Sequence, residues 1–374
     1  MNAKNNEYHA PIVFHPGETL AEKLNELQMG VKEFAVRTNK PEKTIIAVLK
    51  GESSITPEMA VKFENVLKIP AHFWLNLQRN YDEFVARQKE RESLKKSVEW
   101  VKKFPIAEMI KKGWISPQKT IEEKTKALLA FFGMSSPEAW ENYFLNQELK
   151  MAFRISLVHT KDPYAISAWL RKGELQAEEL PSSTYDEKKF EAALPKIKSI
   201  MAKHPFDFFQ QLQTICLEAG VKVIVTPCIK KAPVNGCTRW LNDNPLIQLS
   251  GRYKRNDIFW FTFFHEAGHI LLHGKKDIFL ENIEYSDKDS LKEKEADDFA
   301  VRWTLSKEEE DEILKRLETK KLRFMDDEIL KFAEKFNTHP AIIIGRLQHR
   351  KIISHSSGNK FFKIIDFSQS KDKN

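Results

Sequence analysis

The feature that most constrains this chain is an almost wholly apolar run from Asp257 to Gly274 that contains three polar groups. Asp257 can cap the first turn of a helix and Gly274 can end it, and a helix that is apolar on all sides is buried inside its domain. His265, Glu266 and His269 interrupt this run, and the two imidazoles share one helix face because they are four residues apart. Burying these groups is unfavourable unless something pairs with them. A divalent metal ion held by the two histidines would offset that cost.

The residues from His265 to His269 read HEAGH, the HExxH pattern in which zincin metallopeptidases place two zinc ligands and a general base on one helix. The alternative is a pair of core histidines whose polar atoms are satisfied by neighbouring groups. A catalytic Zn²⁺ needs a third protein ligand and one open position. His273 lies too far along the helix from His265 to share one ion with it. We therefore assign His273 to the C-terminal end of the helix or to the rim of the cleft.

We expect the third ligand from the downstream segment EKEADDFA, Glu293–Ala300. Glu295, Phe299 and Trp303 recur at positions i, i+4 and i+8, which predicts that Glu295 lies on an inward apolar stripe. Glu293 is offset from that stripe. The predicted third ligand is therefore Glu295.

The predicted chemistry is metal-assisted hydrolysis of a peptide bond, with Zn²⁺ as the cofactor and Glu266 as the general base. Asp298 is a candidate to accept a hydrogen bond from the outer nitrogen of a ligating histidine, with a solvated surface acid as the alternative. An oxyanion donor is also required, and the sequence leaves four candidates open: Arg239, Tyr253, His273 and Tyr285.

Three short strand-like runs precede the HExxH helix, at Val221–Thr226, Cys237–Leu241 and Leu246–Ser250. Turn-forming Pro, Gly and Asn residues separate them. We predict a small antiparallel sheet whose edge strand lies beside the metal site and can pair with an extended peptide.

Residues 15–81 contain a series of short helices. The second covers Val31–Arg37, a turn follows at residues 38–40, and the third begins at Pro41, a favoured first helical residue. Two short helices joined by a tight turn inside a bundle of five predict a helix-turn-helix domain.

The third helix of that domain is apolar where a DNA-reading helix is usually polar. Ile46 and Ala47 cannot donate hydrogen bonds to phosphates or base edges, and Glu42 would repel phosphate. The remaining candidates for DNA contact are Lys32, Lys40, Lys43, Thr44 and Lys50. The sequence leaves two alternatives open, which are binding of operator DNA and packing of this helix on a protein partner or on the rest of the chain.

The N-terminal segments HPGETL (15–20), VLKGESSITPEMA (48–60) and FWLNLQ (73–78) resemble the HigA-type antitoxins of the Xre helix-turn-helix family. This resemblance implies a DNA-binding domain, commonly a homodimer, that represses its own operon beside a toxin.

The segments FTFFHEAGHILLHG (261–274) and EKEADDFA (293–300), with TRWL (238–241) and IQLSGRYK (247–254), resemble the ImmA/IrrE metallopeptidase family. HPAIIIGRLQHR (339–350) resembles the end segment of helix-turn-helix members of that group. The resemblance implies zinc on His265, His269 and Glu295, a catalytic Glu266, and a repressor or regulator as the protein substrate.

Composition fits a protein of the cytoplasm. No run approaches a membrane-spanning helix, and the N-terminus lacks an apolar signal core. The three cysteines have no CxxC spacing, so neither a disulfide framework nor a thiolate zinc site is expected. A net charge of +7 is a mild indication of an acidic partner.

We predict a multidomain, mainly α protein of four parts. These are an all-α helix-turn-helix bundle at 15–81, a helical connector or subdomain at 82–150, an α+β zincin-like (gluzincin) peptidase domain at 151–325, and a C-terminal helical segment with a basic tail at 326–374. The predicted function is a zinc-dependent metalloendopeptidase that cleaves or controls a partner such as a repressor or toxin. The alternative is a HigA-type DNA-binding antitoxin or transcriptional repressor with a structural or regulatory metal site.

Overall fold

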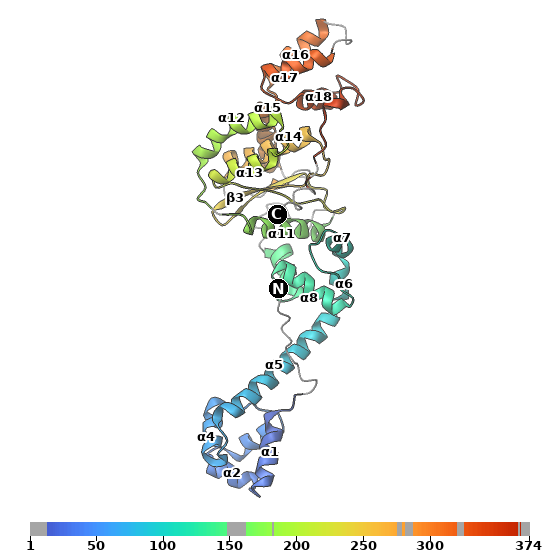
Figure 1. Ribbon diagram of the computed structural model, residues 1–374. Coiled ribbons are helices and arrows are strands. Elements are labelled where there is room, and N and C mark those ends of the chain that lie inside the picture. The colour runs from blue at the N-terminus through green and yellow to red at the C-terminus, as the bar shows by residue number, and fades with distance from the viewer. Residues whose placement is uncertain are drawn as a thin grey trace. The chain divides into compact units, whose positions relative to one another are not determined.

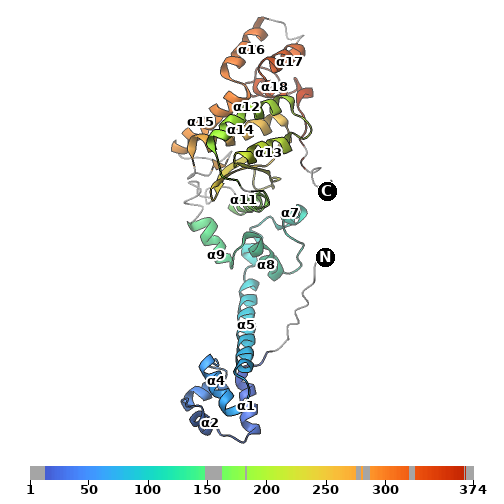
Figure 2. The same ribbon diagram turned by 60° about the vertical axis from the view of Figure 1, so that its left-hand side comes forward.

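The structure is a computed structural model that describes residues 13–147, 162–181, 183–274, 279–280, 287–319, 325–365 and 367 (Figures 1 and 2). The chain separates into two compact units, residues 1–98 and 99–374. None of the described helices combines the length and the apolar character that crossing a bilayer requires.

The N-terminal unit is a helical bundle built from α1 (Pro16–Glu26), α2 (Val31–Arg37), α3 (Glu42–Leu49), α4 (Pro57–Leu67) and α5 (Ala71–Lys95). Both α1 and α4 begin with proline, and the side chains of His15 and Thr56 accept hydrogen bonds from backbone N–H groups of the first turn. Large side chains with no exposed surface fill the core: Leu20, Phe34, Ile45, Phe63 and Trp74.

The connection between α2 and α3 is the tight turn that the sequence predicts. Thr38 Oγ1 donates to the carbonyl of Phe34 at 2.7 Å, and Asn39 adopts a left-handed conformation with φ of 48°. Asn tolerates that conformation better than most residues, so the chain reverses within a few residues. The helix-turn-helix prediction is confirmed.

Short helices follow the N-terminal unit: α6 (Val98–Lys102), α7 (Ile106–Lys111), α8 (Ile121–Phe132), α9 (Pro137–Glu141) and the π-helical turn η1 (Asn142–Gln147). A capping box formed by Thr120 and Glu123 starts α8. Trp100, Phe104, Phe132 and Trp140 pack against one another, with ring centroids 4.8–5.9 Å apart. This aromatic cluster is the core of the segment.

The second unit contains a small sheet of β1 (Lys222–Val225), β2 (Gly236–Leu241), β3 (Asn244–Leu249) and β4 (Phe279–Leu280), in the order β1-β3-β2-β4. Strands β2 and β3 form a hairpin with a two-residue turn, and Asn242 in that turn has a φ of 56°. The sequence predicted an antiparallel sheet. The observed sheet is mixed, because β1 pairs with β3 in parallel. The long connection after β1 carries the chain past β3 to β2, so sequence order does not set the pairing.

Helices cover both faces of this sheet (Figures 1 and 2). One face is covered by α12 (Glu187–Lys203), α13 (Phe208–Glu218) and α14 (Asn256–His273), and the other by α11 (Pro163–Glu178). On the α11 side, the buried Gln248 donates to the carbonyl of Trp169 at 2.8 Å. A Cβ at Gly173 would overlap the Gln248 side chain, so this glycine lets α11 approach the sheet closely.

The α14 helix carries the HExxH residues and is packed between the sheet and α15 (Asp287–Thr304). Its fully buried aromatic residues include Trp260, Phe263 and Phe264. The remaining described helices are α16 (Lys307–Thr319), α17 (Met325–Lys335), α18 (Pro340–His349) and the short η4 (Asn359–Phe361). The fold is therefore mainly helical with one small sheet, as predicted.

Candidate functional site

The HExxH residues lie in the stretch of α14 from Thr262 to Ile270, in which every residue is buried. The helix begins at Asn256, and its N-cap is Arg255, two residues before the predicted cap Asp257; Arg255 makes no side-chain capping bond. Asp257 accepts two hydrogen bonds from Arg255, at 3.0 and 2.7 Å, and does not cap the helix. Gly274 ends the helix with a φ of 72°, as expected from the sequence.

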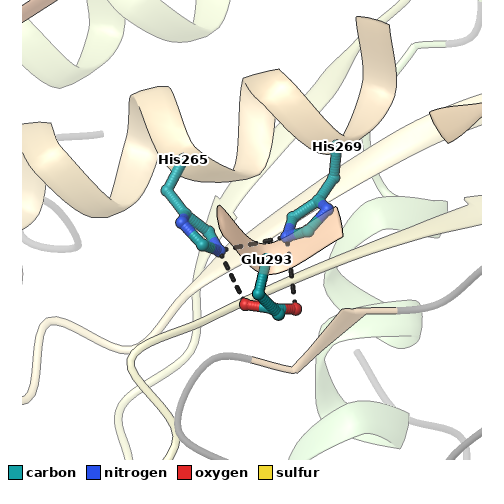
Figure 3. A group of neighbouring side chains, drawn as sticks. All are labelled: His265, His269 and Glu293. Carbon is teal, nitrogen blue, oxygen red and sulfur yellow. Dashed lines mark hydrogen bonds and ion pairs between the residues drawn. The ribbon is translucent and has the colours of Figure 1, made fainter. Parts of the chain in front are cut away.

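Two histidines of α14 and one glutamate of α15 converge on one point (Figure 3). The Nε2 atoms of His265 and His269 are 3.0 Å apart. The carboxylate of Glu293 places Oε2 at 3.3 Å from His265 Nε2 and Oε1 at 3.5 Å from His269 Nε2. Ligand atoms around a tetrahedral Zn²⁺ with bonds of about 2.0–2.1 Å are separated by roughly 3.3 Å. The spacing of the three groups therefore fits one small ion.

The protonation of the two rings explains why these groups need a cation between them. His265 Nδ1 lies 2.9 Å from Asp297 Oδ1, so this outer nitrogen carries a proton and Nε2 is the nitrogen available to a metal ion. Burial lowers the pKa of His269 well below its usual value, which favours the neutral form of this ring. Two imidazole nitrogens and a carboxylate facing one point form a donor set suited to Zn²⁺.

Glu295 does not occupy the predicted place. Its side chain is 51% exposed, and its Oε2 lies 2.9 Å from His273 Nε2. The prediction followed the large apolar residues of α15, but two small residues of this helix, Ala296 and Ala300, have no exposed surface. Glu293 precedes Ala296 by one turn and therefore faces the two histidines.

The outer partners of the histidines also differ from the prediction. Asp298 lies 3.3 Å from Lys307 Nζ and its side chain is 47% exposed, so it matches the solvated alternative. Asp297, which the sequence reasoning missed, contacts His265. Glu293 and Asp297 are four residues apart, the spacing that also brings His265 and His269 onto one face, and this repeated spacing was the available signal.

Glu266 is fully buried between α14 and β2. Thr238 Oγ1 of β2 donates to Glu266 Oε2 at 2.6 Å and lies 3.0 Å from the Glu266 carbonyl oxygen. A Cβ at Gly236 would overlap Glu266 Oε1 and the side chain of Thr262, so the absence of a side chain at Gly236 leaves room for this carboxylate. Thr238 was not predicted to be a site residue.

Arg239 is not near the cluster. It follows Thr238 in β2, and successive residues of a strand face opposite sides of the sheet. Its guanidinium pairs with Glu174 of α11 at 2.6 Å and donates to the carbonyl of Leu170 at 2.5 Å. Arg239 therefore holds α11 on the sheet and does not donate to a substrate.

The other oxyanion candidates have different positions. Tyr253 lies in the loop before α14, is 51% exposed, and has the Arg252 guanidinium 5.1 Å from its ring centroid. His273 is engaged by His269 and Glu295. Tyr285 lies outside the described residues. The described part of the chain singles out no oxyanion donor.

The candidate DNA-contact residues lie on α2 and α3 and at their ends. Lys32, Lys43 and Lys50 are exposed, and Thr44 is half-buried. The side chain of Lys40 is 16% exposed and pairs with Glu58 at 3.0 Å, so part of its charge is already compensated. Beside these residues, Ile46 is 38% exposed on α3.

Residues 216–347 match the family model Peptidase_M78, described as the IrrE N-terminal-like domain. This range contains the two histidines, Glu266 and Glu293. An uncharacterized HTH-type transcriptional regulator, YddM of Escherichia coli strain K12, is 38% identical over 63 residues, which are 17% of this chain and 67% of that protein.

Solved antitoxin structures also resemble part of this chain. An addiction module antidote protein of a HigA family from Coxiella burnetii is 36% identical, covers 23% of this chain and 94% of its own, and has a TM-score of 0.21. The Pseudomonas aeruginosa antitoxin HigA, solved with the higBA promoter, is 26% identical, covers 21% of this chain and 86% of its own, and has a TM-score of 0.21.

Proposed function

We propose that this protein is a zinc-dependent endopeptidase that acts on a partner protein in gene regulation. Its N-terminal region belongs to the HTH-type transcriptional regulators, and residues 216–347 form an IrrE N-terminal-like domain of the peptidase M78 family. The observation that carries the proposal is the convergence of two imidazoles and a carboxylate beside a buried glutamate. Three acceptors directed at one point repel one another unless a cation lies between them.

The ion would be held by His265 Nε2, His269 Nε2 and the carboxylate of Glu293. When bound, Zn²⁺ supplies Lewis-acid chemistry, because it polarises a substrate carbonyl and lowers the pKa of water. Three protein ligands are the number used by catalytic zinc sites, whereas structural zinc sites have four. The donor set of the described residues therefore favours a catalytic role over a structural one.

Glu266 is the general base of the proposed reaction. The Thr238 hydroxyl donates a hydrogen bond of 2.6 Å to Oε2 of the Glu266 carboxylate, and the absence of a side chain at Gly236 leaves space around Oε1. Oε1 would take a proton from the attacking water and deliver it to the nitrogen of the leaving amine. Holding one oxygen fixed keeps the other at a constant position while it gains and loses the proton.

The test compares the full chain with its Glu266→Gln and His265→Ala variants. Wild-type protein should bind one zinc ion per chain and generate new N-termini in proteins of a cell lysate. Glu266→Gln should retain the zinc and produce none of these N-termini, and His265→Ala should lose the zinc. Equal cleavage by wild type and Glu266→Gln would refute the proposed chemistry.

The match to a transcriptional regulator favours a second function for the N-terminal unit, which is binding of operator DNA as a homodimer. Lys43 and Lys50 are exposed on or beside α3 and are suited to phosphate contacts. A mobility-shift titration with the protein's own promoter, repeated across salt concentrations, should show specific binding that weakens in a Lys43→Ala, Lys50→Ala variant. Equal affinity for promoter and unrelated DNA would contradict operator recognition.

The cleavage assay and the promoter-binding assay together distinguish the proposed function from its alternative, a DNA-binding antitoxin with a regulatory metal site. In the alternative, promoter binding would respond to zinc, and Glu266→Gln would behave as wild type in every assay. In the proposed function, Glu266→Gln alters cleavage and leaves promoter binding unchanged.

A further inference from the structure

His273 and Glu295 form a chain of contacts that begins at a metal ligand. His269 Nδ1 lies 3.0 Å from His273 Nδ1, and His273 Nε2 lies 2.9 Å from Glu295 Oε2. The side chains of His269 and His273 are 0% and 3% exposed, whereas Glu295 is 51% exposed. The chain therefore runs from the buried ligand to a carboxylate at the surface.

Only one placement of protons satisfies all of these contacts when the metal is bound. His269 must offer a lone pair at Nε2, so its proton is on Nδ1, and that N–H donates to His273 Nδ1. His273 then carries its own proton on Nε2, which donates to Glu295 Oε2. Each nitrogen then has one role.

We propose that His273 and Glu295 are positioning residues for His269, a proposal that rests on the metal site in the proposed function. His273 fixes the tautomer and the ring plane of His269 by accepting its Nδ1 proton, and Glu295 fixes those of His273 in the same way. Outer partners of this kind raise the basicity of a ligating imidazole and hold its lone pair on the ion.

The other histidine of the proposed metal site, His265, is also linked to a carboxylate, but without an imidazole in between. Its Nδ1 lies 2.9 Å from Asp297 Oδ1, so a carboxylate contacts it directly. His269 is one turn further along α14 and pairs with His273, the next residue on its face. Each of the two histidines is thus linked to a carboxylate of α15, His265 directly and His269 through the imidazole of His273.

The first test measures Zn²⁺ affinity of the full chain by competition with a chromophoric chelator. His273→Phe removes the acceptor for the His269 N–H and should weaken Zn²⁺ binding by about 10- to 100-fold. Glu295→Ala should weaken it less, and Glu295→Gln, which keeps an oxygen acceptor, should retain more affinity than Glu295→Ala. Asp298→Asn is the matched control, because Asp298 lies on the same helix and pairs with Lys307; it should bind as wild type does.

A second readout separates positioning from a loss of structure. In zinc-loaded protein with ¹⁵N-labelled histidine, the His269 Nδ1–H should give a downfield proton resonance that is protected from exchange. This resonance should disappear in His273→Phe and persist in Asp298→Asn, while the circular dichroism of all variants stays that of wild type.

Three outcomes would overturn the proposal. Unchanged affinity and an unchanged resonance in His273→Phe would show that His273 does not act on His269. A Co²⁺ spectrum that gains or loses a ligand in His273→Phe would make His273 a direct ligand. A wild type that binds no Zn²⁺ would instead refute the proposed function, so the two failures are distinguishable.

Discussion

The described structure predicts that acid lowers the free energy of unfolding of the second unit through two buried histidines that are far in sequence from His265 and His269. His204 caps the C-terminus of α12 and His339 caps the N-terminus of α18, and their rings lie 5.8 Å apart with 8% and 6% of each residue exposed. Trp260 Nε1 donates to His204 Nδ1 at 3.0 Å, and the backbone N–H of Ala341 donates to His339 Nδ1 at 3.1 Å. Both rings therefore act as neutral acceptors.

The sign of the effect follows from the direction of the shifts. Burial lowers the pKa of His204 and of His339 to about 4, and each ring also faces the positive charge of Lys363. An unfolded histidine titrates near 6.5, so between pH 6.5 and 4 the unfolded state binds protons that the folded state excludes. The contribution of these neutral rings to the free energy of unfolding is complete above pH 6.5 and is lost as the pH falls toward 4.

The magnitude follows from the same values. At pH 5.5 an unfolded histidine is about nine-tenths protonated while the folded ring remains neutral, which lowers the free energy of unfolding by about 1.3 kcal/mol per histidine relative to pH 7.5. Together the two rings contribute about 2.7 kcal/mol, a large share of the stability of an ordinary domain.

Urea unfolding of the full chain at pH 7.5 and pH 5.5, followed by circular dichroism, measures this loss. His339→Asn keeps a capping acceptor but cannot take up a proton, so its loss between the two pH values should be smaller than that of wild type by about 1.3 kcal/mol. Contributions shared by both proteins, including those of the metal site, cancel in this comparison. The exposed His355→Asn is the matched control, and an equal loss in wild type and His339→Asn would refute the reasoning.

Three further predictions concern the metal site. Gly236→Ala places a methyl group on Glu266 and Thr262, so it should lower the free energy of unfolding by about 1–3 kcal/mol in urea and reduce cleavage; wild-type stability would contradict the packing argument. Thr238→Val removes the hydroxyl that donates to Glu266 and should cost about 1.5–3 kcal/mol in the same assay, whereas Thr238→Ser should retain most of the stability. Removing Zn²⁺ with a chelator should lower the thermal midpoint of wild type, because free Zn²⁺ at one hundred times Kd stabilises the folded state by about 2.7 kcal/mol. His265→Ala should show no such shift, and a shift in that variant would place the ion elsewhere.

The part of the metal site that lies on one helix could be predicted from sequence. The spacing of His265 and His269 fixes their common face through helix geometry alone, and the structure brings their Nε2 atoms to 3.0 Å. The same local rules predict the turn between α2 and α3, because a few residues decide it.

The third group of the candidate metal site, Glu293, could not be predicted in the same way, because its position depends on how two helices cross. Counting large apolar residues on α15 selected the stripe through Glu295 and Phe299, and Phe299 does pack against Gly268 of α14. The buried face of α15 also includes Ala296 and Ala300, which have no exposed surface, and Glu293, one turn before Ala296, is the carboxylate that reaches the histidines. The parallel pairing of β1 is likewise a tertiary feature, since a residue pattern identifies a strand but not its neighbour.

The alternation along β2 has a consequence for how this gene can change. Thr238 faces the glutamate on one side of the sheet and Arg239 faces α11 on the other, and the two-residue turn at Asn242 sets which residue does which. A one-residue slip of β2 against β3 would exchange the two faces, so that Arg239 would meet Glu266 and the Thr238 hydroxyl would meet Glu174. A homologue whose turn differs in length by one residue should therefore absorb the change within the loop and keep the register of β2 and β3, because a slipped strand would lose the partners of both Glu266 and Glu174.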